Sequence, residues 1–138
     1  MATQTKYLDF VEQLGLAQHN LNTDTLRAWL SNTAPTNTDT TFPGTATDLG
    51  TGNGYTAGGE DIQNTWSEAA GTASLVCVDV VWTAAGGTIG PFRYVGIYND
   101  TNATNRVGPG FFDYGSGITL QIGETFTLDF GANLITLA

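Results

Sequence analysis

The sequence predicts a mainly β protein, a single β-sandwich or barrel domain that begins with a short α-helix. The first observation is the segment Leu75–Asp100, in which two apolar strands flank a Gly–Gly turn and a Gly–Pro corner. The second is a series of short apolar segments at roughly ten-residue spacing, separated by Gly-, Asn- and Asp-rich turns. The third is length, because 138 residues suffice for one domain with its own core.

Residues 1–22 are expected to form an N-terminal helix and arm. A helix is predicted over Lys6–Leu14, because four apolar residues follow the spacing i, i+3, i+4, i+7 and form one stripe. These residues are Tyr7, Phe10, Val11 and Leu14. Thr5 is placed to cap the helix and Gly15 to end it. Since so short a helix is marginal alone, we expect the stripe to pack on the chain's own sheet; a neighbouring subunit is the alternative.

Residues 23–138 are expected to form the β-sandwich domain. Its first strand lies within Asp24–Thr33, where apolar residues alternate with others. The loop Ala34–Gly59 follows and is rich in Thr, Gly, Asn and Pro. A loop of this length is functional, ordered by a partner, or disordered. Its candidate anchors to a surface are Phe42, Leu49 and Tyr55.

The segment Leu75–Trp82 is expected to be a central strand, because both of its faces are apolar and such a strand is covered on both. By the period-two rule one face carries Val76, Val78, Val80 and Trp82, and the other Leu75, Cys77, Asp79 and Val81. The next strand, Pro91–Asn99, has Phe92, Tyr94 and Tyr98 on one face and Arg93, Val95 and Ile97 on the other.

Shorter strands complete the predicted domain. They are Ile62–Trp66, Phe111–Tyr114, Ile118–Ile122, Thr125–Phe130 and Leu134–Leu137. Turns are predicted at Asn99–Asn105, Gly115–Gly117 and Gly123–Glu124, where residues that favour turns gather.

Charge and composition exclude several classes of function. Only four basic residues stand against thirteen acidic ones, a net charge of −9. Nucleic acids and anionic membranes both require basic surface, so neither is an expected partner. Met1–Lys6 is polar and starts no signal peptide, so synthesis in a cytoplasm without an export signal is expected. Cys77, the single cysteine, is expected to be a buried small apolar residue.

No residue pattern predicts catalysis, a cofactor or a metal site. His19 is the only histidine and has no evident nucleophile beside it. The run Gly50–Gly54 lacks the Lys and the helix that follow a phosphate-binding loop. Five residues in or beside the long loop are possible Ca²⁺ ligands, but they have no EF-hand spacing and are better explained as turn caps. These are Asp39, Asp48, Asn53, Glu60 and Asp61.

Asp79 and Arg93 are expected to pair, or one of them to face a subunit interface, because a buried carboxylate is costly unless it is paired. With the helix stripe and two loop anchors they form the candidate interface. Its members are Tyr7, Phe10, Val11, Leu14, Phe42, Tyr55, Asp79 and Arg93.

Four segments, in their order and spacing, carry a resemblance to a known family. They are KYLDFVEQLGLAQHNLNTDTLRAWLSNTAP, GNGYTAGG, GGTIGPFRYVGIYND and FFDYGSGITLQIGETFTLDF. Together they are similar to small structural proteins encoded beside the head and tail genes of tailed bacteriophages. The resemblance implies a non-enzymatic virion protein, assembled in the host cytoplasm. It implies a capsid decoration (cement) protein first, and a tail or neck protein otherwise.

The implied partners are the major capsid protein or other virion proteins, with a homo-oligomer expected by the same analogy. Two alternatives come from other classes. One is a carbohydrate- or receptor-binding module, which requires a groove of exposed aromatic and amide side chains. The other is a small particle-associated hydrolase, which requires a convergent acid–base pair such as His19 with Asp61 or Glu68.

Overall fold

A computed structural model describes residues 2–138 and confirms a mainly β, sandwich-like domain with one short helix near its N-terminus. The elements are β1 Thr3–Lys6, α1 Leu8–Gly15, β2 Leu26–Ser31, β3 Glu60–Asp61, β4 Thr65–Ala69, β5 Thr72–Val76, β6 Val80–Thr83, β7 Ile89–Asn99, β8 Val107–Leu120, β9 Thr125–Leu128 and β10 Ile135–Leu137.

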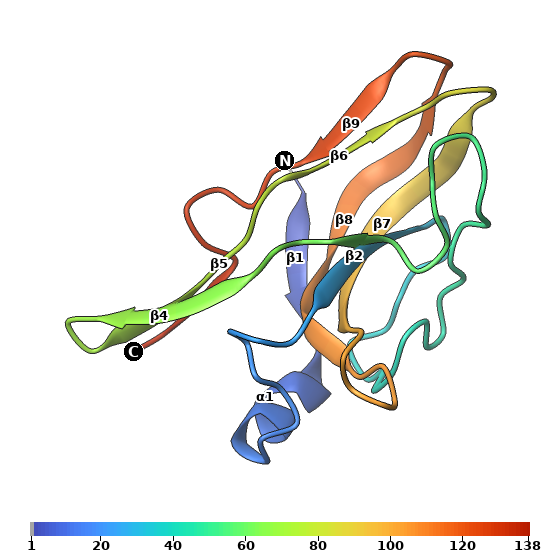
Figure 1. The fold of residues 1–138 in the computed structure, drawn as a ribbon. Coiled ribbons are helices and arrows are strands. Elements are labelled where there is room, and N and C mark those ends of the chain that lie inside the picture. Colours follow the sequence, from blue (N-terminus) through green and yellow to red (C-terminus); the bar gives the residue numbers. More distant parts are fainter. Residues whose placement is uncertain (1) are drawn as a thin grey trace.

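The strands form two layers (Figure 1). The first layer is a five-stranded sheet in the order β1-β8-β7-β2-β3. The second layer contains a three-stranded sheet, β10-β5-β4, and a two-stranded sheet, β6-β9. Because β5 leads directly into β6 and β9 leads into β10, these two sheets are two ends of one bent layer.

One side of the sandwich is closed by a segment that passes from the first layer to the second. β3 pairs with β2, and β4 pairs with β5. Between them, Ile62 donates its N–H to the carbonyl of Leu26 at 3.0 Å and accepts the N–H of Val78 at 2.9 Å. The predicted strand Ile62–Trp66 is therefore a crossing between layers, and only its last two residues belong to β4.

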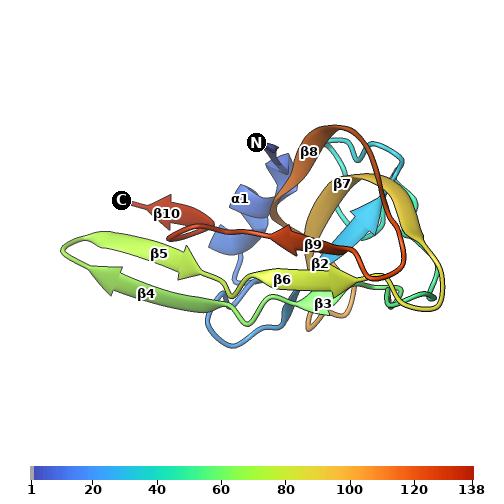
Figure 2. The ribbon, with the colours of Figure 1, turned by 90° about the horizontal axis from the view of Figure 1, so that it is seen from above.

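The opposite side of the sandwich is open. There β1 ends the first sheet and pairs with β8 only, while β10 ends the three-stranded sheet and pairs with β5 only. The β4–β5 hairpin extends beyond the first sheet in both views, and Figure 2 shows β10 beside it (Figures 1 and 2). The two layers consequently part along β1 and β10, next to α1.

The main core fills the space between the layers. Its largest fully buried side chains are aromatic or branched aliphatic: Trp82, Tyr7, Phe92, Leu26, Leu30, Ile62, Leu75, Ile97, Leu128 and Val95. Each such side chain contributes about 1.5–3 kcal/mol when it leaves water, before the loss of chain entropy is subtracted.

The segment Leu75–Trp82 is not one strand, contrary to prediction. β5 and β6 are separated by residues 77–79, and the buried positions change phase across this break. The buried residues are Leu75 in β5 and Cys77 at the start of the break, and then Val80 and Trp82 in β6. If strict alternation is applied through the break, the residues on one side of it are assigned to the wrong face of the sheet.

Asp79 lies in this break, where its carboxylate accepts the backbone N–H of Phe130 at 3.0 Å. The prediction that both faces of the segment are covered is wrong. No element packs on the outer face of the second layer among residues 2–138, which leaves three valines there exposed: Val76, Val78 and Val81.

The predicted strand Pro91–Asn99 corresponds to β7, but its two faces differ from the prediction. Irregular register against β8 brings Phe92, Val95 and Ile97 into the same core. The predicted turn at Gly115–Gly117 lies within β8, a 14-residue strand in which Gly115 has φ +85°. The chain therefore bends there without reversing.

The N-terminal residues contribute a strand that the sequence analysis missed. Thr5 lies in β1 and does not cap the helix; Tyr7 occupies the cap position without a capping side chain. The helix begins two residues later than predicted and includes Gly15 as its last residue. Tyr7 and Phe10 are buried in the main core, whereas Val11 is 54% exposed, so the stripe packs within the chain only in part.

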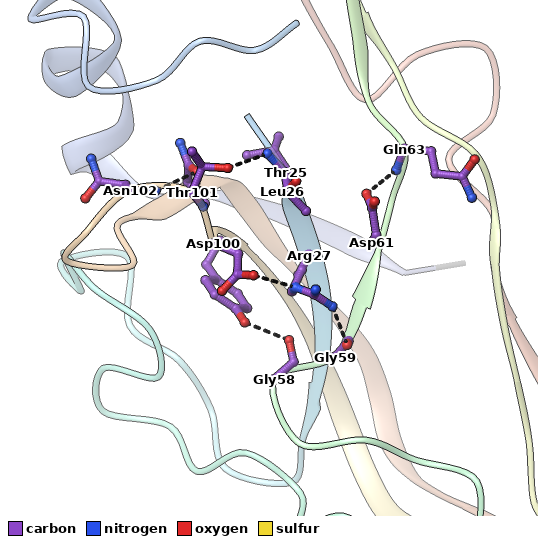
Figure 3. Close-up of polar contacts among 12 residues, drawn as sticks. Thr25, Leu26, Arg27, Gly58, Gly59, Asp61, Gln63, Asp100, Thr101 and Asn102 are labelled. Atoms are coloured by element: carbon purple, nitrogen blue, oxygen red, sulfur yellow. Dashed lines mark hydrogen bonds and ion pairs between the residues drawn. The ribbon is translucent and has the colours of Figure 1, made fainter. Parts of the chain in front are cut away.

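The long loop Ala34–Gly59 covers the outer face of the first sheet. Phe42 stacks on Tyr98 with ring centroids 4.1 Å apart and meets the edge of Trp29 at 4.9 Å. Polar contacts reinforce this packing, because Arg27 donates to the carbonyl of Gly59 and to Asp100 (Figure 3). β2 is therefore covered on both faces by its own chain.

Candidate interface on the open side of the sandwich

Two neighbouring hollows lie on the open side, on either side of Gln4 in β1. The first, which we call the β1 groove, has a volume of about 280 Å³. It is lined by Gln4, Lys6, Phe10, Val11, Leu14, Trp66, Pro109, Ile135, Thr136 and Leu137. The second, the end cavity, has a volume of about 450 Å³. It is lined by Ala2, Gln4, Phe112, Tyr114, Thr127, Asp129, Phe130, Gly131, Asn133 and Leu134.

Five elements line the β1 groove: β1, α1, β4, β8 and β10. The helix α1 presents Val11 and Leu14 from one side, and β10 presents Ile135 and Leu137 from the other. Trp66 of the projecting β4–β5 hairpin completes the wall. Val11 and Leu137 are 54% and 57% exposed, so the groove offers apolar surface that no other part of the described chain covers.

The charge of the groove differs from that of the whole protein. Its described lining contains no carboxylate, although acidic residues outnumber basic ones thirteen to four in the chain. The three arginines pair with Asp100, Asp113 and Asp9 at 2.8–3.1 Å. Lys6 is the one basic residue without an ion pair within residues 2–138, and it lies at the groove.

The end cavity has a different chemistry. The rings of Phe112 and Tyr114 share it with the carboxylate of Asp129 and the amides of Gln4 and Asn133. Burial, together with the negative charge of Asp129, raises the pKa of the Tyr114 phenol. The hydroxyl therefore stays protonated at neutral pH and remains a hydrogen-bond donor.

The structure divides the predicted helix stripe between the core and the open side. Tyr7 is buried, and burial followed by the charge of Asp39 raises the pKa of its phenol. Phe10 is mostly buried but reaches the β1 groove. Val11 and Leu14 also line the groove, so three of the four stripe residues lie at this candidate interface.

The two loop anchors hold the chain's own loop in place. Phe42 is half-buried against Trp29 and Tyr98. Tyr55 is buried in the main core, where its hydroxyl donates to Asp48. Both side chains are used within the chain, and neither lines the β1 groove.

Asp79 and Arg93 do not pair, contrary to the first of the two predicted outcomes. Arg93 donates two hydrogen bonds to Asp113 on β8, at 2.8 and 3.1 Å, and lies over the ring of Tyr94. Asp79 is exposed at the break after β5 and binds a backbone N–H instead. Sequence neighbourhood suggested adjacent strands, but β7 lies in the first layer and Asp79 in the second.

The residues considered for catalysis and metal binding serve the chain's own turns and core. His19 is buried, with Nδ1 3.0 Å from Asn99 Nδ2. Asp39 accepts hydrogen bonds from Thr36 and Thr45, and Asp48 from Tyr55 and Gly58. No three His, Cys, Asp or Glu residues within 2–138 converge as a metal site would require.

Sequence reasoning missed seven of the ten residues that line the β1 groove: Gln4, Lys6, Trp66, Pro109, Ile135, Thr136 and Leu137. The segment TQTK of β1 has no apolar alternation, so nothing in it marks a strand edge. A signal did exist in Leu134–Leu137, an apolar strand at the end of the sequence, but only the topology shows that β10 has a free edge.

No protein-family model, curated protein or solved structure matches this chain. Among residues 2–138, the one helix is too short and too polar to cross a membrane.

Proposed function

We propose that this chain is a structural protein of a tailed-bacteriophage virion, and specifically a capsid decoration protein that binds and stabilises the head shell. The observation that carries the proposal is the β1 groove, an exposed apolar surface next to two free strand edges. Exposed apolar surface beside unpaired strand edges is a feature of sites that bind another molecule. The resemblance of the four segments to phage structural proteins supports a virion protein as that other molecule.

Two further properties suit a protein displayed at high density on a particle. The net charge of −9 keeps neighbouring copies soluble through repulsion. The long loop is fixed in place, since it packs on its own sheet and closes a second small core. Repetition on a symmetric shell converts one modest contact per copy into firm attachment.

The test is binding of the purified protein to capsids assembled without it. Saturation at a copy number fixed by the shell symmetry supports the proposal. Leu137→Glu places a charge in the β1 groove and is expected to abolish binding, whereas Val81→Glu is the matched control. Val81 is 56% exposed, like Leu137, but lies on the outer face of the second layer. Binding only to tails, or to no particle, contradicts the decoration role.

A second candidate function, carbohydrate or receptor binding by the virion, is favoured by the end cavity. Its volume of about 450 Å³ lies in the range of small-molecule sites. Aromatic rings beside a carboxylate and two amides are groups that contact the faces and the hydroxyls of a sugar. A glycan array tests it, with Asp129→Ala expected to lose any ligand that the native protein binds.

A further inference from the structure

We propose that the β1 groove binds an extended peptide segment of a partner protein, which adds a strand to the free edge of β1 and places a carboxylate beside Lys6. The proposal deepens the proposed function, because on a particle this segment belongs to a shell protein. The partner is therefore expected to be extended at the interface and to carry a negative charge there.

The backbone of β1 supplies the first part of the argument. β1 is the last strand of its sheet and uses one edge for β8. Alternate N–H and C=O groups of its four residues therefore point away from the sheet and need a partner or water. Four residues offer about 13 Å of edge, enough for a short added strand.

The groove supplies the second part. A strand paired with β1 sends alternate side chains to the same side as the core, and the β1 groove is the hollow on that side. Its walls of Val11, Leu14 and Leu137 accept apolar side chains.

Charge supplies the third part. Lys6 lies at the end of β1 without an ion pair within residues 2–138, beside a lining that has no carboxylate. A lysine on a free edge discourages pairing with other strands in general. A partner strand that carries Asp or Glu at this position gains a favourable contact instead, so Lys6 selects among extended segments.

The same charges disfavour a second copy of this chain as the occupant. In a two-fold pairing of two β1 strands centred between Gln4 and Thr5, Lys6 lies opposite Thr3 of the second copy and meets no carboxylate of that strand. Two copies also repel each other, since each carries a net charge of −9. The segment is therefore assigned to a different protein.

A yeast-displayed library of random octapeptides, sorted with the fluorescently labelled full-length protein, tests the proposal. Selected peptides are expected to alternate apolar residues and to carry one Asp or Glu. Their binding is expected to fall at least about tenfold for Val11→Glu and for Leu137→Glu, and to be unchanged for Val81→Glu. Lys6→Glu is expected to reverse the charge preference, so that sorting enriches Lys or Arg. Bound peptide should also slow hydrogen exchange of backbone N–H groups in Thr3–Lys6.

Several results would overturn the proposal. They are the absence of any enriched peptide, selected peptides that bind Val11→Glu as well as the native protein, or a charge preference that Lys6→Glu leaves unchanged. A homo-oligomer that Val11→Glu dissociates assigns the groove to a second copy and also overturns it. These measurements use no particles. If the protein binds peptides but does not bind capsids, only the decoration role is contradicted. If it binds capsids but selects no peptide, only the added strand is contradicted.

Discussion

The hydroxyl of Tyr55 donates a hydrogen bond of 2.5 Å to Oδ1 of Asp48 and accepts the backbone N–H of Leu30 at 3.0 Å. The second oxygen of Asp48 accepts the N–H of Gly58 at 2.6 Å. These contacts tie two points of the long loop to each other and to β2. Burial, followed by the hydrogen bond to Asp48, raises the pKa of the Tyr55 phenol, so it stays a donor throughout the neutral range.

The first prediction follows from this clamp. Tyr55→Phe keeps the ring but removes the hydroxyl partner of the buried N–H of Leu30 and one of the hydrogen bonds to the half-buried carboxylate of Asp48. We expect a loss of about 1–3 kcal/mol in the free energy of unfolding, the cost of an unsatisfied buried group. Urea denaturation measures it. Thr56→Val, which removes an exposed hydroxyl from the next residue, is the control and should shift stability by less than about 0.5 kcal/mol. Equal effects would contradict the clamp.

A second prediction concerns the close approach of β7 to Trp29. A Cβ on Gly96 would lie 2.3 Å from Trp29 Nε1, and the indole is fixed because Trp29 is fully buried. Gly96→Ala is therefore expected to destabilise the fold by about 1–3 kcal/mol through overpacking. Gly15→Ala is the matched control, because nothing lies within 4 Å of its Cβ position. Because Gly15 is the last residue of the helix, its replacement should stabilise by at most about 0.5 kcal/mol, so thermal denaturation should show a lowered midpoint for Gly96→Ala only.

A third prediction concerns the reactivity of Cys77. Burial raises the pKa of its thiol to about 12, so at pH 8 almost none of it is thiolate, the reactive form. We expect the native protein to react with a thiol reagent only as fast as it unfolds, and one equivalent to react at once in guanidinium. Rapid labelling of the native protein at pH 8 would contradict the burial of this side chain.

How far the sequence predicts the fold depends on whether a pattern is interrupted. β2 and β9 were predictable because their apolar residues alternate without a break. The segment Leu75–Trp82 was not, because residues 77–79 shift the alternation by one position and Asp79 stabilises the shift through a backbone contact with Phe130. A bond between residues 51 positions apart leaves no trace in a local pattern.

The candidate interface shows the same limit. The apolar stripe of α1 was visible, and Val11 and Leu14 do line the β1 groove. The other wall comes from the last strand of the chain, so the groove exists only once β10 lies opposite α1. Lys6 could not be singled out either, because its lack of an ion pair depends on which acidic residues the fold brings near the three arginines.

The last prediction concerns pH, through His19. Asn99 Oδ1 accepts the N–H groups of Thr101 and Asn102, which fixes the amide so that its Nδ2 donates to Nδ1 of His19. The ring is therefore neutral, with its proton on Nε2, which is buried without a partner within residues 2–138. A second proton would have to sit on Nδ1, facing the N–H of Asn99.

Burial lowers the pKa of His19 below 6.5, and the positive charge of Arg106 lowers it further. The nearby carboxylates of Asp24 and Asp9 raise this pKa, but their effect is smaller than that of burial. The unfolded chain then binds a proton at a higher pH than the native protein does. Stability is therefore full above about pH 6.5 and declines below it, by about 1.4 kcal/mol for each pH unit down to the native pKa. Urea midpoints between pH 8 and pH 5 measure this decline. His19→Gln removes the titrating group, so the difference between native and variant stability should shrink as the pH falls below 6.5; a difference independent of pH would contradict the buried neutral ring.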